Sequence, residues 1–157
     1  MLQLTNKEKM LLEDQKKHEE ICIEKYTNYA NQAQDEALKQ IFLDYASQEQ
    51  EHLNSINQLL SGQLPAMNQA GSGQNQMKPV PQPANNMDGA MANSPDAALC
   101  NDMLMTEKYI SNTYDTAIFE FVDPNVRQLL NHIQKEEQEH GEGIFNYMYS
   151  MGMYNPQ

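Results

Sequence analysis

The string EQEH stands at Glu49–His52 and again at Glu137–His140. Glutamate and histidine are poor core residues, so one copy alone is typical of a solvated helix face. Other identical residues coincide when the halves are aligned at the offset of 88 that separates position 49 from position 137. The further pairs are Glu19 with Glu107, Tyr26 with Tyr114, Asp35 with Asp123, Gln40 with Gln128, and Ile56 with Ile144. The chain therefore contains an internal repeat, and each half carries Glu, Tyr and Glu-x-x-His.

Helix start signals divide the chain into four helices. Thr5 and Glu8 form a capping-box pattern, in which each side chain satisfies a free backbone N–H of the first turn. Asp35, Ser94 and Asp123 are favoured N-cap residues, and the last two stand directly before a proline. The joins near Asp35 and Asp123 are short, so the helices on either side of each join must form an antiparallel hairpin.

The segment 62–94 between the hairpins has a different composition. It is rich in Gly, Pro, Gln and Met and shows no hydrophobic period, so burial cannot offset the entropy lost on ordering it. We therefore expect a flexible crossover that joins a hairpin over about 6–61 to one over about 95–151. Two hairpins with a long crossover predict an all-α, ferritin-like four-helix bundle, a single domain over 1–157.

Acidic residues and histidines lie on helix faces that are otherwise apolar. The inward faces follow from steps of three and four residues along each helix. The polar residues on these faces are Glu19, Glu49 and His52 in the first half and Glu107, Glu137 and His140 in the second. Neighbouring acidic residues lie off these faces, and we expect them to be solvated. They are Glu20, Glu51, Glu136, Glu139 and Glu142.

Four buried carboxylates in one place need a counter-charge. A buried carboxylate without a partner costs several kcal/mol, and like charges repel one another. Two divalent cations would balance the four charges, with the neutral imidazoles completing the ligand set. One Glu from each of two helices, with Glu-x-x-His from each of the other two, is the arrangement of di-iron and di-manganese carboxylate bundles. The sequence predicts two divalent transition-metal ions, and it does not distinguish iron from manganese.

Other interpretations of these residues stay open at this stage. The site could hold protonated carboxylates, hydrogen bonds or a single zinc ion instead of a metal pair. Tyr26 and Tyr114 lie on the same faces. They are either core residues whose hydroxyls need a partner or groups that hydrogen-bond the metal-binding carboxylates.

Composition excludes several classes of partner. The 22 acidic residues against 10 basic ones give a net charge of -12, which repels nucleic-acid phosphates and anionic membranes. No stretch approaches the roughly 20 apolar residues of a membrane span, and the start has no signal-peptide core, so we expect synthesis in the cytoplasm without membrane insertion. Cys22 and Cys100 form no CxxC pair and are expected to be buried thiols.

The repeated pattern resembles the rubrerythrin branch of ferritin-like proteins. The stretches LCNDMLMTEKYISNTYDTAIFEF and VRQLLNHIQKEEQEHGEGIFNYM of the second half resemble more specifically the Coat F family of spore coat proteins from endospore-forming bacteria. This resemblance implies a ferritin-like bundle located in the spore coat, with other coat proteins as partners, and it allows a homo-oligomer. It also implies metal ligation by the six inward residues, with Tyr26 and Tyr114 around them. The CxxC-bound iron domain usual in rubrerythrins has no counterpart here.

Three functions are consistent with these observations. The first is a Coat F spore coat protein that holds a dinuclear iron or manganese centre. The second is an enzyme of the rubrerythrin or manganese-catalase type that removes peroxide. The third is a metal-free structural scaffold, and the catalytic residues stay unassigned.

Overall fold

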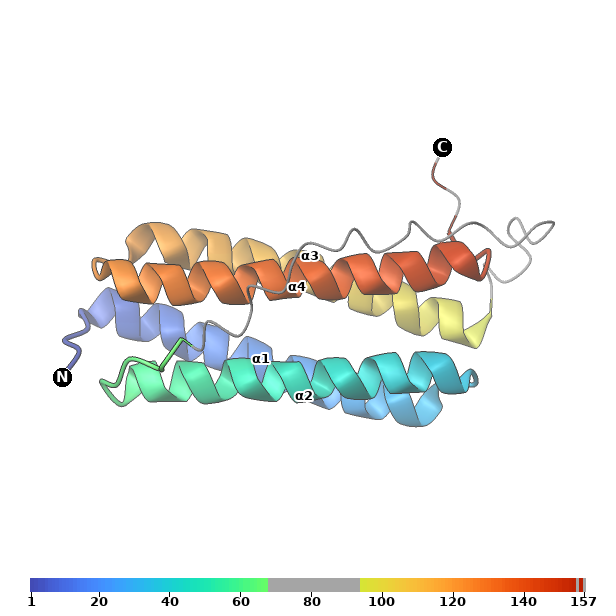
Figure 1. The fold of residues 1–157 in the computed structure, drawn as a ribbon, viewed down its shortest axis with the longest axis horizontal. Helices are drawn as coiled ribbons and strands as arrows, with labels where there is room; N and C mark the ends of the chain where they lie inside the picture. The colour runs from blue at the N-terminus through green and yellow to red at the C-terminus, as the bar shows by residue number, and fades with distance from the viewer. Residues whose placement is uncertain (68–93, 155, 157) are drawn as a thin grey trace.

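Four α-helices form the part of the chain that the computed structural model describes, which is residues 1–67, 94–154 and 156. They are α1 (Asn6–Gln32), α2 (Glu36–Leu60), α3 (Pro95–Glu120) and α4 (Pro124–Ser150). α1 packs along α2 and α3 along α4, and the two hairpins meet through α1 with α3 and α2 with α4 (Figure 1). The predicted all-α bundle of two hairpins is confirmed.

The direction of the helices shows what the crossover must join. α2 ends at the same end of the bundle where α1 begins, whereas α3 begins at the opposite end (Figure 1). The chain between them therefore has to connect opposite ends of the bundle, as a crossover connection does. The prediction that residues 62–94 are flexible falls on positions 68–93, which lie outside the described residues.

The predicted capping residues begin the helices. Thr5 and Glu8 form both bonds of the capping box at the start of α1, and Asp35 accepts a hydrogen bond from the backbone of α2. Ser94 and Asp123 do the same for α3 and α4, each followed by proline in the first turn. Each bond satisfies a backbone N–H that has no partner within its helix. No helix of the described residues combines the length and apolar character needed to cross a membrane.

A carboxylate from each hairpin binds the turn of the other hairpin. Glu8 of α1 accepts a hydrogen bond of 2.9 Å from the backbone N–H of Val122, in the turn between α3 and α4. Asp96 of α3 accepts bonds of 2.8 and 3.0 Å from the N–H groups of Gln34 and Asp35, in the turn between α1 and α2. Glu8 and Asp96 are 88 positions apart, so these two reciprocal clamps, as we call them, follow the repeat.

Two apolar clusters fill the bundle. One lies toward the start of α1 and contains Leu12, Ile56, Phe121 and Leu130 among others. The second lies toward the start of α3 and contains Phe42, Cys100, Met103, Ile144 and Met148 among others. Along α2, α3 and α4 the predicted polar residues fall between members of the first cluster and members of the second. The bundle thus places a polar centre between two apolar layers.

Candidate metal centre

All six inward polar residues are buried at the middle of the bundle. Each is at most 3% exposed. α1 supplies Glu19, α2 supplies Glu49 and His52, α3 supplies Glu107, and α4 supplies Glu137 and His140. The structure brings together every residue that the repeat predicted. Their potential ligand atoms form two groups, and within each group the atoms lie within 4.8 Å of one another.

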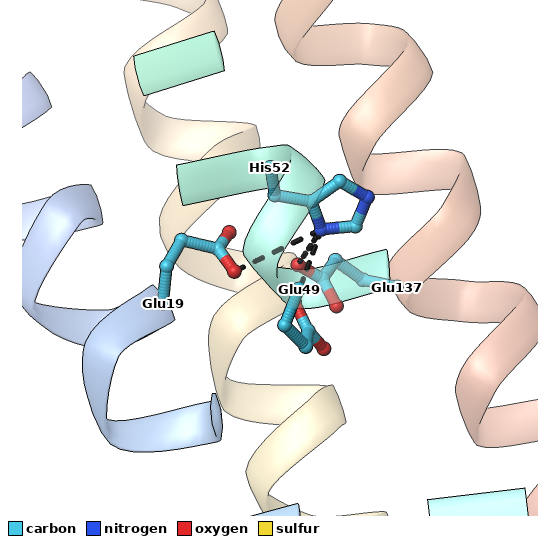
Figure 2. Close-up of side chains that lie close together, drawn as sticks. All are labelled: Glu19, Glu49, His52 and Glu137. Atoms are coloured by element: carbon cyan, nitrogen blue, oxygen red, sulfur yellow. Dashed lines mark hydrogen bonds and ion pairs between the residues drawn. The ribbon is translucent and has the colours of Figure 1, made fainter. Parts of the chain in front are cut away.

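The first group consists of Glu19, Glu49, His52 and Glu137. The Nδ1 atom of His52 lies 3.0 Å from Glu49 Oε2, 3.2 Å from Glu137 Oε1 and 3.8 Å from Glu19 Oε2. Figure 2 shows these three carboxylates gathered on one side of the imidazole ring. Three oxygens and one nitrogen therefore face a common point, which we call position one.

The second group consists of Glu49, Glu107, Glu137 and His140. The Nδ1 atom of His140 lies 3.1 Å from Glu49 Oε1 and 3.4 Å from both Glu107 Oε1 and Glu137 Oε2. We call this position two. Glu49 and Glu137 belong to both positions and turn one carboxylate oxygen toward each, so they are placed to bridge two ions.

Two tyrosine hydroxyls hold the carboxylates that belong to a single position. Tyr26 of α1 donates a hydrogen bond to Glu107 of α3, and Tyr114 of α3 donates one to Glu19 of α1. Burial and the nearby carboxylates raise the pKa of both hydroxyls well above the usual value. The tyrosines therefore stay protonated and act as donors, and each links the two hairpins.

The outer nitrogens of the two histidines have different partners. The Nε2 atom of His52 lies 2.7 Å from a carboxylate oxygen of Glu136, whereas the Nε2 atom of His140 meets the side-chain oxygen of Gln48. Gln48 and Glu136 are equivalent in the repeat, because each stands directly before the Glu of its Glu-x-x-His. Position one is thus supported by a charged acceptor and position two by a neutral one.

The prediction that Glu136 is solvated is wrong. Its side chain is only 32% exposed, and it lies between His52 and the Nε2 atom of His132 at 3.3 Å. Glu136 is off the inward face of its own helix, but α2 lies close enough for the histidine to reach it. The contact with His52 of the other hairpin brings Glu136 to the edge of the centre, and the periodicity of α4 alone could not predict it.

Tyr45 is a further residue of the site; helical periodicity puts it on the inward face of its helix, but it is not among the predicted site residues. Its ring stacks on His140, with centroids 4.3 Å apart and planes at 26°, and meets Tyr26 edge-on at 5.7 Å. Its hydroxyl occupies the space in which a Cβ of Gly143 would lie. The repeat gave no signal for Tyr45, because its counterpart is Ile133.

Without metal, protons balance part of the negative charge. Burial disfavours the charged imidazolium of His140, but the three buried carboxylates close to it, Glu49, Glu107 and Glu137, outweigh this and raise its pKa to about 12. The same opposition raises the pKa of His52 well above its usual value, with the bond to Glu136 the largest favourable cause. For Glu107 burial dominates and raises the pKa well above that of an ordinary glutamate. The metal-free centre thus carries protons on both histidines near neutral pH.

Four buried carboxylate oxygens have no hydrogen-bond partner among the described residues. They are Glu19 Oε2, Glu107 Oε2 and both oxygens of Glu137. Buried polar atoms are rarely left unpaired, because each loses its hydration without compensation. Oxygen and imidazole nitrogen are ligands that divalent iron, manganese and zinc accept. The donor set therefore fits a pair of divalent cations.

The C-terminal half of the chain matches a known family. Residues 95–157 match the family profile described as the Coat F domain, which spans α3 and α4 and contains Glu107, Tyr114, Glu137 and His140. Neither the curated proteins nor the solved structures compared with the chain gave a match. The second hairpin is therefore similar to the Coat F domain, and the match covers less than half of the chain.

Proposed function

We propose that this chain is a spore coat protein whose bundle binds two divalent transition-metal ions, iron or manganese. The observation that carries the proposal is the pair of four-residue groups that share Glu49 and Glu137. In this assignment Glu19 and His52 complete position one, and Glu107 and His140 complete position two. Tyr26 and Tyr114 orient the two unshared carboxylates through their hydroxyl groups.

Charge balance supports two ions in preference to one. Two divalent ions carry four positive charges, which equal the charge of the four buried glutamates when they are ionised. A single divalent ion would leave two carboxylates to be neutralised by protons, at the cost of burying them near each other. The mirrored geometry of the two positions also gives each ion one histidine and three carboxylate oxygens.

The outer partners of the histidines fit the same assignment. A metal-bound imidazole normally donates its second N–H to an acceptor, which fixes the tautomer and the ring orientation. Gln48 and Glu136 supply such acceptors at the Nε2 atoms, so the Nδ1 atoms are free to face the metal positions.

The test is elemental analysis of the purified protein from cells grown with added iron and manganese. About two ions per chain are expected in the wild type. Glu49→Gln and Glu137→Gln should lose both ions, because each removes a shared ligand. Glu51→Gln and Glu139→Gln are matched controls from the same two strings, with exposed side chains, and they should keep the metal. A metal-free wild type with intact helicity by circular dichroism would contradict the proposal.

A further inference from the structure

A pocket of about 280 Å³ between α3 and α4 reaches the centre from the surface. Exposed polar side chains stand at its outer part, namely Lys108, Asn112 and Gln138. Its inner part is formed by Glu107 and Glu137, which are 2% and 0% exposed. The pocket therefore leads from solvent to two of the buried carboxylates.

Three of the four unpaired buried oxygens belong to these two glutamates. Both oxygens of Glu137 and one oxygen of Glu107 lack a partner among the described residues. These oxygens are themselves buried, so they lie behind the inner wall of the pocket, which the two glutamates help to form. An unpaired polar atom beside a pocket is a place where a small polar ligand or water can gain a hydrogen bond.

Small residues of the second hairpin open this side. Gly141 and Ser111 line the pocket, and their counterparts at the offset of 88 in the first hairpin are Leu53 and Ile23. A Cβ built on Gly141 would meet only Glu107 Cβ and a methyl group of Leu104, each at 3.9 Å. Both neighbours also line the pocket, so a larger side chain at Gly141 would extend into it.

We propose that this pocket binds a small exogenous ligand of the metal pair, neutral or singly charged and two or three heavy atoms long. The inference rests on the proposed metal centre. Each position offers one histidine nitrogen and three carboxylate oxygens, and an ion held there would accept a further ligand, because octahedral ions take six. The pocket delivers such a ligand to the side of Glu107 and Glu137, and Gly141 keeps the path open.

Azide is a suitable probe, because it is a small anion that coordinates iron and manganese. It would be titrated into the metal-loaded protein by isothermal titration calorimetry. Gly141→Leu should weaken azide binding by at least about tenfold, or 1.4 kcal/mol, while metal content and helicity stay at the wild-type level. Gly141→Ala adds only a methyl group, which would make ordinary van der Waals contacts of 3.9 Å, and it should change the affinity by less than about twofold.

Leu53→Met is the matched control in the first hairpin. It alters a side chain at the equivalent position on the other side of the bundle, and it should leave azide affinity unchanged. If azide binds the metal-loaded Gly141→Leu variant as tightly as it binds the wild-type protein, the inference is overturned. Wild-type protein that holds two metal ions but no azide would also overturn it and leave the metal centre intact. A wild type without metal would instead refute the proposed function, and this inference with it.

Discussion

Metal binding should release protons, and their number follows from the structure. In the metal-free protein the raised pKa values keep His52 and His140 protonated at pH 7. A metal ligand has to be deprotonated, because the proton and the metal compete for one lone pair. Two ions that occupy both positions therefore displace about two protons in total, one from each histidine.

The size of the pH effect follows directly. Each displaced proton changes the binding constant about tenfold per pH unit, which corresponds to about 1.4 kcal/mol. With two protons, the product of the two association constants should rise about a hundredfold per pH unit, or about 2.8 kcal/mol. The sign is fixed because both histidines have raised pKa values, so binding strengthens as pH increases between about 6 and 8.

Isothermal titration calorimetry in buffers of different ionisation enthalpy measures this number at one pH. The observed heat depends linearly on buffer enthalpy, and the slope is the number of protons released. His52→Gln should lower the slope by about one proton, whereas Glu51→Gln should leave it unchanged. A wild-type slope below one proton for two bound ions would refute the assignment of protonated ligands in the metal-free centre.

Three further predictions concern stability and the surroundings of the centre. The metal-free protein should lose stability as pH rises from about 7 to 9, by up to about 1.4 kcal/mol per unit for each site histidine. The reason is that the pKa of each histidine is higher in the folded protein than its unfolded value of 6.5, so its contribution to stability is complete below pH 6.5 and is lost as pH rises toward the folded pKa. A thermal unfolding midpoint that increases between pH 7 and 9 would disprove this prediction. Glu136→Gln should weaken metal binding at position one by about tenfold, and Gln48→Glu should strengthen metal binding at position two. Competition with a chromogenic chelator measures both affinities. Equal changes at the two positions would argue against the assignment of one outer acceptor to each histidine. Gly143→Ala should lower the free energy of unfolding in urea by about 1–3 kcal/mol, because the new methyl group overlaps the Tyr45 hydroxyl. Tyr45→Phe in the same chain should recover part of this loss. If it recovers none, the overlap is not the cause of the loss.

Much of the fold could be predicted from local signals. The capping residues and the two short turns define four helices, and the repeat identifies the six residues that the bundle brings together. These features depend on positions within one helix, or on identity at one offset, and both can be read without knowing how the helices pack. The metal role of the six residues stays a prediction that the elemental analysis tests.

The surroundings of the centre could not be predicted in the same way. Glu136 and Gln48 reach histidines of the opposite hairpin, and Tyr45 lies against His140 because Gly143 leaves room for its hydroxyl. Each contact depends on how α2 and α4 are rotated and spaced relative to each other. Helical periodicity says which face of a helix is buried, but it contains no information about the partner's side chains.

The reciprocal clamps at the two ends of the bundle have an implication for its symmetry. Glu8 binds the turn of the second hairpin as Asp96 binds the turn of the first, and Tyr26 and Tyr114 exchange partners in the same manner. These four contacts form two pairs, and in each pair the contact from one hairpin is returned by the other at equivalent positions. This is the isologous pattern found between the subunits of a two-fold symmetric dimer. The interface inside this single chain is thus built as a homodimer interface would be, with the crossover joining what would otherwise be separate subunits.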